Sequence, residues 1–339
     1  NWLSARRALM RKPLDRIGYG GYLSLAYKFP AFTDYIEKLT DEFRDIYDKI
    51  HGRKPYCGLK VAVLNCWGRL RSWQAYMVAH ALWYKQTYSY FGMLEALSGM
   101  SVDVCFLSFD EILSSGIPKD VDVIIHAGDA GTAYSGGSRW EDEKLVSLVR
   151  RWVHEGGGLV GIGEPSAVHK NGRFFQLADV FGVEKELGFT LSTDKYFTKP
   201  LEQHYLTQDR TGPFDFGEGM KNIYALGADT EIVEYSDHEV HLAVHPYGKG
   251  KSVYMAGLPY SCENTRLLLR SLYCAAGQEE KLYRWYADDP QCEVHAYPKA
   301  GIYAVLNNSG EERSTTVYDG LGRTEQITLE AGAIRWKTI

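Results

Sequence analysis

Two short segments combine residue types that suit the binding of a polar ring. Segment 15–21 places Asp15, Arg16 and Tyr19 among three glycines. A carboxylate and a guanidinium can form bidentate hydrogen bonds with hydroxyl groups, and a phenol ring offers a flat apolar face. Glycine permits positive φ and close approach of the backbone. The segment therefore predicts a binding site for a sugar.

The second segment is a loop that follows an expected buried strand. It contains Trp67, Arg69, Arg71 and Trp73 within eight residues. A surface loop rarely exposes so much aromatic area, so we expect these side chains to line a pocket rim or to form an interface with another domain or subunit. We also expect Asp129 at such a rim because it follows a strand, although an Asx-turn explains it equally well.

Two glycine-containing segments resemble nucleotide-binding motifs but lack required features. Residues 250–252 read Gly-Lys-Ser, yet His245 stands where a P-loop has its first glycine, and a strand is expected to follow instead of a helix. Residues 161–166 nearly match the dinucleotide fingerprint, with Ser166 in place of the third glycine. We interpret them as a tight turn from a strand into a helix that begins at Pro165. No organic cofactor is predicted.

Neither a metal centre nor a working nucleophile is predicted. His241 and His245 share one face of an expected strand, His238 points the other way, and no acid lies nearby, which favours a solvated polar face. Glu164 stands where amidotransferase-like sheets carry a nucleophile, and Cys66 ends a central strand with no His placed beside it. An amidotransferase-like hydrolase that uses Cys66 or Glu164 is the alternative reading of these positions.

The expected elements alternate between strands and helices through the middle of the chain. Strands are expected at 59–65, 102–109, 121–127 and 159–162, and helices at 74–97 and 141–154. This alternation indicates a doubly wound parallel sheet, whose binding loops lie at the carboxyl ends of the strands. A meander is expected over 223–258, followed by a helix over 264–276.

The two ends of the chain follow other patterns. Residues 1–52 contain a short helix, the glycine turn and one amphipathic helix, which cannot enclose a core alone, so we expect them to lean on a missing upstream part or on the next domain. Residues 281–339 contain short strands separated by turns, which indicates a small β-sandwich. The expected domains are 1–55, 56–279 and 280–339.

The composition of the 339 residues excludes several classes of protein. The 38 Lys and Arg residues against 43 Asp and Glu residues give a net charge of -5, which argues against a protein that coats nucleic acid. No apolar run is long enough for a membrane helix, and the first residues resemble neither a signal peptide nor a chain start. We expect a cytoplasmic protein and a chain cut from a longer one.

Four segments carry a resemblance to a known family. Residues 15–25, 64–90, 123–137 and 161–167 are similar, in this order, to the galacto-N-biose/lacto-N-biose phosphorylases. The resemblance implies a broken TIM barrel, of which this chain holds the tail, then an amidotransferase-like doubly wound α/β domain without a nucleophile, and a C-terminal β domain.

The resemblance also implies an activity. The family uses inorganic phosphate to cleave a β-galactosyl linkage to N-acetylhexosamine or rhamnose, and it releases α-galactose 1-phosphate with inversion. Phosphate is already an anion, so one general acid suffices where an inverting hydrolase needs two carboxyl groups. The acid is expected in the missing barrel, so no catalytic residue is expected in this chain, which would be inactive alone. Asp15, Arg16 and Tyr19 would line the galactose subsite.

Further partners and alternatives follow from the same residues. The expected partners are the galactosyl disaccharide, phosphate, the barrel and a second subunit, and the expected function excludes a metal or other cofactor. One alternative is a non-catalytic scaffold or oligomerisation module in which Trp67, Trp73 and Trp83 form an interface. The other is a galactosyl-rhamnose phosphorylase.

Overall fold

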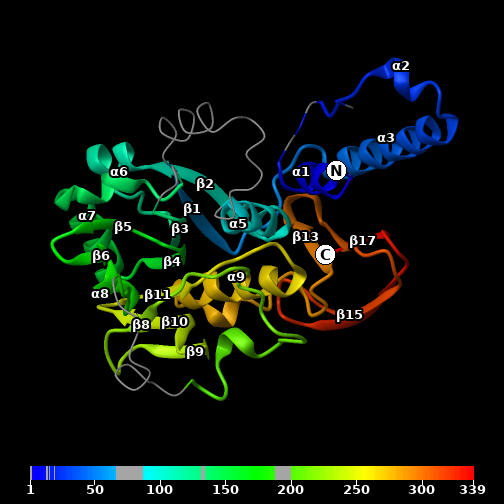
Figure 1. The fold of residues 1–339 in the computed structure, drawn as a ribbon. Coiled ribbons are helices and arrows are strands. Elements are labelled where there is room, and N and C mark those ends of the chain that lie inside the picture. Colours follow the sequence, from blue (N-terminus) through cyan, green and yellow to red (C-terminus); the bar gives the residue numbers. More distant parts are fainter. Residues whose placement is uncertain are drawn as a thin grey trace. The chain divides into compact units, whose positions relative to one another are not determined.

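The computed structural model describes residues 2–12, 14, 16–18, 20–65, 87–130, 134–187 and 200–339 (Figure 1). The chain divides into two compact units. The terminal unit combines Asn1–Cys57, Ser98–Ser101 and Tyr283–Ile339, and the central unit contains Gly58–Leu97 and Val102–Leu282. The terminal unit thus joins the two ends of the chain, whereas the central unit is continuous except for the four residues Ser98–Ser101.

The central unit is built on a seven-stranded sheet with the order β2–β1–β3–β4–β11–β10–β9. The first five strands are parallel to their neighbours, and β10 is antiparallel to both β11 and β9. The strands are β1 (Leu59–Asn65), β2 (Val102–Ser108), β3 (Val123–Gly128), β4 (Gly158–Gly163), β9 (Glu231–Ser236), β10 (Glu239–Tyr247) and β11 (Gly250–Met255). The predicted mixed α/β architecture with a parallel centre is confirmed.

Helices cover both faces of the parallel part of this sheet. Strands β3 and β4 are buried along their whole length, as apolar strands are when both faces are covered. Figure 1 shows α6, α7 and α8 on one side of the sheet and α5 and α9 on the other. The helices are α5 (Thr87–Gly99), α6 (Phe109–Ser115), α7 (Glu143–His154), α8 (Ala178–Phe181) and α9 (Cys262–Ala275).

The turn after β4 differs from the prediction. Residues 161–166 were expected to lead into a helix, but they lead into β5 (Ala167–Lys170), which pairs with β6 (Arg173–Phe175). Ser166 has a φ of 56°, a left-handed conformation that does not continue into a right-handed helix. A second short pair, β7 (Val183–Lys185) with β8 (Ile223–Ala225), follows.

The described part of the terminal unit contains three α-helices and two small antiparallel sheets. The helices are α1 (Trp2–Arg11), α2 (Leu23–Ala26) and α3 (Pro30–Ile50). The sheets have the orders β12–β15–β16 and β13–β14–β17. Their strands are β12 (Tyr286–Ala287), β13 (Cys292–Tyr297), β14 (Ile302–Asn307), β15 (Arg313–Tyr318), β16 (Thr324–Leu329) and β17 (Ile334–Thr338).

The first helices of the chain pack on its last strands. A buried cluster joins α1 and α3 to β13 and β14, and its members are Leu9, Met10, Ile46, Ile50, Tyr297, Ala304 and Leu306. The hydroxyl of Tyr297 donates a hydrogen bond to the carbonyl oxygen of Met10 at 2.7 Å. The N-terminal helices therefore complete a core with the C-terminal β-sheets. Among the described residues, no helix combines the length and the apolar character needed to cross a membrane.

Candidate functional site

A groove in the terminal unit lies beside the segment predicted to bind a sugar. Its volume is about 1000 Å³, and it is lined by residues of α1, of α3 and of the segment between α1 and α2. Arg16, Ile17, Gly18 and Gly20 contribute to the lining. Most of the other lining side chains are apolar, among them Phe43 of α3. The groove therefore combines an exposed guanidinium with an apolar wall.

The structure describes only part of the predicted site. Arg16 is exposed and lines the groove. Asp129, predicted at a pocket rim or interface, is also described and is discussed below. The remaining predicted binding, rim or interface residues lie outside the described residues. They are Asp15, Tyr19, Trp67, Arg69, Arg71 and Trp73. Cys66, the alternative nucleophile, lies outside them as well.

Gly18 and Gly20 add no side chain of their own to the lining beside Arg16. Neither residue has a positive φ, which corrects the expectation that these glycines serve a turn of that kind. A Cβ added to either would meet no heavy atom within 4 Å. Among the described residues, no neighbouring atom therefore requires glycine at either position.

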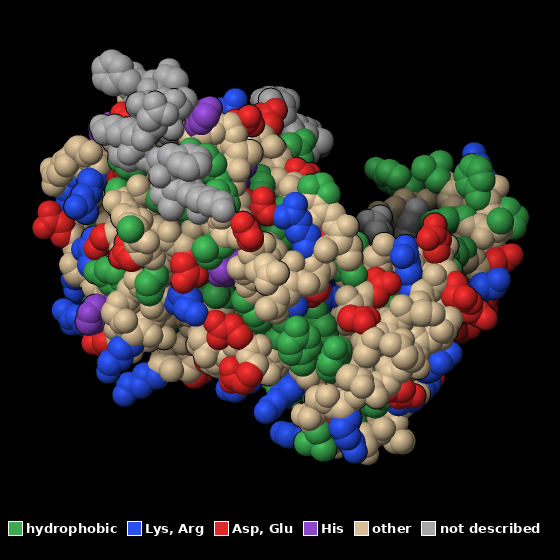
Figure 2. Space-filling view, turned by 90° about the horizontal axis from the view of Figure 1, so that it is seen from below, with side chains coloured by type: hydrophobic (Ala, Val, Ile, Leu, Met, Phe, Trp, Pro, Cys, Tyr) green, Lys and Arg blue, Asp and Glu red, His purple; other side chains and the backbone are tan. Residues whose placement is uncertain are grey.

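Large apolar side chains are exposed around α2 and the start of α3. Tyr22, Tyr27 and Phe29 are 79%, 77% and 62% exposed. Figure 2 shows hydrophobic side chains gathered on this part of the terminal unit. Contiguous apolar surface of this kind usually marks a site of contact with further protein.

A second polar cluster lies in the central unit, at the carboxyl ends of β3 and β4. Asp129 follows β3, Glu164 follows β4 and Lys185 ends β7. Lys185 Nζ forms an ion pair with Glu164 Oε1, and the backbone N–H of Ala130 donates to Glu164 Oε2 at 2.8 Å. A Cβ added to Gly163 would lie 3.0 Å from Asp129 Oδ1, which leaves Asp129 directly beside the β4 turn. We call these three side chains the carboxylate cluster.

Asp129 is buried in the central unit, with only 5% of its surface exposed. Its predicted role at a pocket rim or interface stays a prediction. Gly128 has a φ of 124°, and a Cβ there would lie 2.7 Å from Cβ of Tyr134, so the chain packs closely just after β3. Sequence reasoning also missed Lys185, because nothing local indicates that the three-residue strand β7 reaches the end of β4.

The surroundings of Asp129 raise the pKa of its carboxyl group. Burial raises its pKa to about 7, repulsion by Glu164 contributes, and Lys185 opposes the shift. A carboxyl group that titrates near neutral pH can exchange a proton under physiological conditions. The turn at Glu164, however, continues into β5, whereas a nucleophile elbow continues into a helix. The geometry therefore does not favour hydrolysis with Glu164 as the nucleophile.

The substitution Asp129→Asn should raise stability more at high pH than at low pH. Because the pKa of Asp129 is about 7 in the folded protein and 3.8 ordinarily, the folded protein holds a proton that the unfolded chain releases between these values. Wild-type stability therefore falls through this window as the pH rises, and asparagine cannot ionise. The difference in unfolding free energy should grow by up to about 4 kcal/mol between about pH 4 and about pH 8. Urea unfolding at several pH values measures it, and a constant difference would contradict the assignment.

Two histidines of the central unit, His126 and His245, lie in its interior. His126 Nδ1 accepts a hydrogen bond from the backbone N–H of Ser166 at 2.9 Å, and Nε2 lies 2.8 Å from the carbonyl oxygen of Ser135. Burial lowers the pKa of His126 to about 4, so the ring is neutral and Nε2 donates. His245 is buried, contrary to the solvated face expected, and its Nε2 lies 3.6 Å from Asp229 Oδ2. In the part of the chain that the structure describes, no group of three or more His, Cys, Asp or Glu residues is arranged to hold a metal ion.

Solved β-galactosidases share the fold of the chain. A cold-adapted β-galactosidase from Rahnella sp. R3 has a TM-score of 0.52 and 14% identity, covering 91% of this chain and 44% of that chain. Gan42B, a GH42 β-galactosidase, has a TM-score of 0.50 and 15% identity, covering 89% of this chain and 44% of that chain. At such low identity the likeness concerns the fold alone.

Curated relatives are much more similar in sequence. A 1,3-β-galactosyl-N-acetylhexosamine phosphorylase of Lachnoclostridium phytofermentans is 52% identical over 100% of this chain and 47% of its own length. A protein of the same name from Bifidobacterium longum is 45% identical over 99% of this chain and 49% of its own length. A D-galactosyl-β-1→4-L-rhamnose phosphorylase of L. phytofermentans is 36% identical over 93% of this chain and 43% of its own length. The chain thus spans about half the length of the relatives it matches.

Three family models match consecutive parts of the chain. Residues 1–58 match the lacto-N-biose phosphorylase N-terminal TIM barrel domain, and residues 285–337 match the C-terminal domain of the same family. Residues 60–280, more than half of the chain, match the lacto-N-biose phosphorylase central domain. The chain therefore belongs to the lacto-N-biose phosphorylase family.

Proposed function

We propose that the chain is part of an inverting phosphorylase that acts on β-1,3-galactosyl-N-acetylhexosamine disaccharides. With phosphate, it would yield α-galactose 1-phosphate and the free N-acetylhexosamine. The observation that carries this proposal is the identity of 45–52%, over nearly all of the chain, to proteins named for that reaction. The galactosyl-rhamnose phosphorylase is the second candidate, and its 36% identity makes rhamnose the less favoured acceptor.

The proposed reaction needs little from the protein besides positioning and one proton. Phosphate supplies an anionic nucleophile, so no general base is required, and a single acid protonates the leaving oxygen. Cationic and backbone donors must hold the phosphate in line with the anomeric carbon. We place the general acid in the part of the relatives that this chain does not span, so the 339 residues alone would be inactive.

This chain would contribute one wall of the sugar site. Arg16, exposed in the groove beside Gly18 and Gly20, is suited to donate hydrogen bonds to galactose hydroxyls. We assign Asp15 and Tyr19 to the same subsite on the family resemblance alone. The apolar wall of the groove and the exposed Tyr22, Tyr27 and Phe29 would pack against the preceding part of the barrel. The match of residues 1–58 to the barrel family supports this placement.

The remaining expectations complete the proposal. The central domain, at about 56–279, would be an amidotransferase-like scaffold between the barrel tail at 1–55 and the β domain at 280–339. Glu164 forms an ion pair with Lys185, which supports a role of the central domain as a scaffold and not as an active hydrolase. The protein would work in the cytoplasm as a homodimer without a cofactor, with Trp67, Arg69, Arg71 and Trp73 at an interface or pocket rim.

The experiment that tests the function uses the full-length protein. It is incubated with phosphate and, separately, galactosyl-β-1,3-N-acetylglucosamine, galactosyl-β-1,3-N-acetylgalactosamine and galactosyl-β-1,4-rhamnose, and galactose 1-phosphate is assayed. We expect phosphate-dependent release from one or both N-acetylhexosamine substrates. Release of galactose 1-phosphate from the rhamnose substrate alone would favour the galactosyl-rhamnose phosphorylase. Absence of release from all three substrates would favour the alternative of a non-catalytic scaffold.

The substitution Arg16→Ala should reduce kcat/KM for phosphorolysis. Loss of charged hydrogen bonds to the sugar should lower it by about 10- to 100-fold. Arg284→Ala, which removes another exposed guanidinium of the terminal unit, is the matched control and should retain activity. Equal rates for both variants would remove Arg16 from the galactose subsite.

A further inference from the structure

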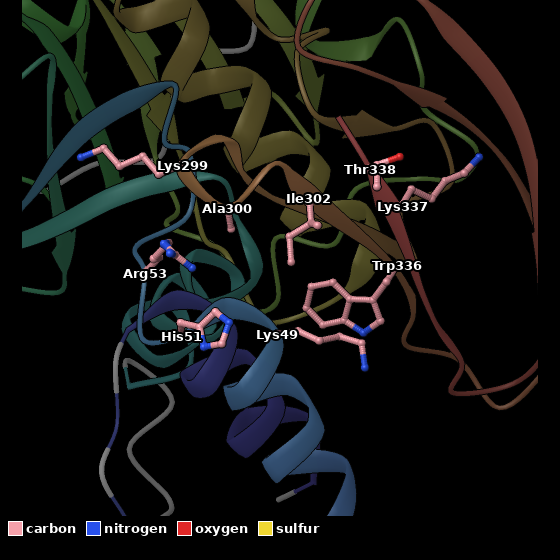
Figure 3. Close-up of a pocket in the computed structure, with 9 residues that line it drawn as sticks. All are labelled: Lys49, His51, Arg53, Lys299, Ala300, Ile302, Trp336, Lys337 and Thr338. Atoms are coloured by element: carbon pink, nitrogen blue, oxygen red, sulfur yellow. The ribbon is translucent and has the colours of Figure 1, made fainter.

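A second cavity in the terminal unit has a lining dominated by basic side chains. Its volume is about 510 Å³, and the nine residues that line it are Lys49, His51, Arg53, Lys299, Ala300, Ile302, Trp336, Lys337 and Thr338. Five of them are Lys, Arg or His, and none is acidic. Figure 3 shows Arg53 and His51 to one side of Ala300 and Ile302, Lys49 beside Trp336, and the side chains of Lys299 and Lys337 extending outward at the two edges. We call this cavity the basic pocket.

The charges of the basic pocket are only partly neutralised by the protein itself. Lys49 pairs with Asp45, and Lys337 pairs with Glu325. Within the described ranges, the side chains of Arg53 and Lys299 form no ion pair. Lys49 lies in the last turn of α3, where a basic group offsets the partial negative charge of the helix end. Arg53 lies three residues beyond the end of α3, and Lys299 lies in the short 3-10 helix Pro298–Ala300 that follows β13.

The floor of the basic pocket is apolar. Trp336 is half-buried, and Lys49 Nζ lies 5.8 Å from the centre of its indole ring. Ile302 of β14 lies beside this indole (Figure 3). The accessible part of the half-buried indole suits contact with a ring of the ligand, and cations around the rim suit an anionic group. The pocket thus offers complementary contacts for a molecule that carries both a ring and an anionic group.

The size and charge of the pocket limit the class of ligand. A volume of about 510 Å³ is typical of sites for one small molecule. The chain carries a net charge of -5, which disfavours extended binding of a nucleic acid. A guanidinium binds phosphate oxygens with two parallel hydrogen bonds, and a phosphate monoester carries up to two negative charges to match several cations.

We propose that the basic pocket binds a small phosphate monoester that carries a ring, with the phosphate at Arg53 and Lys299 and the ring on Trp336. The pocket shares no lining residue with the groove at Arg16, so this binding does not rest on the proposed phosphorylase activity. If that activity holds, its product, a sugar phosphate, belongs to the class that the basic pocket would take.

Calorimetric titration of the full-length protein tests the proposal. α-Galactose 1-phosphate is the probe, at low ionic strength, with inorganic phosphate and galactose titrated separately. The Arg53→Gln/Lys299→Gln variant should lose one class of site or bind there at least about tenfold more weakly. The control variant Arg284→Gln/Arg335→Gln removes two exposed charges of the same unit outside the pocket and should bind as wild type does. Trp336→Ala should weaken binding of the sugar phosphate more than that of inorganic phosphate.

Two results would overturn the proposal. One is that Arg53→Gln/Lys299→Gln binds α-galactose 1-phosphate like the wild type at every class of site. The other is that inorganic phosphate and the sugar phosphate respond identically to Trp336→Ala. If Arg53→Gln/Lys299→Gln unfolds at a lower urea concentration than Arg284→Gln/Arg335→Gln, the binding measurement is repeated with the single variant Lys299→Gln. Phosphorolysis is assayed on the same variants. A variant that loses binding of the sugar phosphate but retains phosphorolysis supports the basic pocket as a separate site. If the wild type shows no phosphorolysis, that result contradicts the proposed function and leaves the test of the basic pocket unchanged.

Discussion

Replacing Glu293 by glutamine is expected to destabilise the terminal unit by about 3–5 kcal/mol, because it leaves a buried guanidinium without its counter-charge. Glu293 of β13 accepts a hydrogen bond from Arg7 Nε of α1 at 2.8 Å, and its other carboxylate oxygen lies 3.1 Å from His295 Nε2. All three side chains are buried or nearly so. Urea unfolding followed by the fluorescence of the tryptophans measures the loss.

The pH dependence of the wild type provides an internal check of the Glu293 assignment. Burial alone would raise the pKa of Glu293, but the hydrogen bond with His295 and the charge of Arg7 outweigh it and hold the pKa below its usual value. The stabilisation is therefore present above the unfolded value of 4.5 and is lost as the pH falls through the lower folded value.

A double-mutant cycle separates the ion pair from general packing. Arg7→Met and Glu293→Met should each be strongly destabilising, whereas the double variant should recover much of the loss because no unpaired charge remains. Additive losses would show that Arg7 and Glu293 contribute independently, and the pair would then not join α1 to β13.

Replacing Lys185 by methionine is expected to destabilise the central unit by about 2–4 kcal/mol near neutral pH. The change removes the cation of the carboxylate cluster and leaves Glu164 and Asp129 close together in the interior. The expected loss is smaller than for Glu293 because Lys185 is 19% exposed and water partly screens it. Urea unfolding at about pH 7.5 and about pH 5 measures the effect, which should shrink at the lower pH as Asp129 becomes protonated.

Two further variants define the cause of the Lys185 effect. Lys185→Arg keeps the charge and should retain most of the stability. Lys185→Met/Glu164→Gln removes both members of the pair and should be more stable than Lys185→Met alone. If Lys185→Met unfolds at the wild-type urea concentration, the ion pair does not stabilise the fold and the cluster needs another explanation.

Local sequence patterns were sufficient for most elements of the central sheet. The apolar run from Leu59 to Asn65 predicts β1 at its observed bounds, and the amphipathic pattern before Gly156 predicts α7. Such patterns work because a strand or helix that buries its side chains must repeat apolar residues at its own period. The family resemblance likewise rests on short local words, among them residues 15–25 and 161–167.

Local patterns failed where the conformation depends on distant partners. Residues 161–166 have the composition of a turn into a helix, but Ser166 is held at positive φ by its hydrogen bond to His126 of β3, forty residues earlier. His245 follows the alternation of a solvated strand face, yet the burial of β10 against the rest of the central unit encloses it.

By itself, the sequence determined the family of the chain and its alternating central fold, and it predicts a sugar-binding role for the segment around Arg16. Only the tertiary structure decided that the first fifty residues share a core with the last strands, that Lys185 neutralises Glu164, and that Arg53 and Lys299 line one pocket. The physical reason is the same in each case. Periodicity reports which side of an element is buried, whereas the identity of the partner depends on long-range packing that no local pattern encodes.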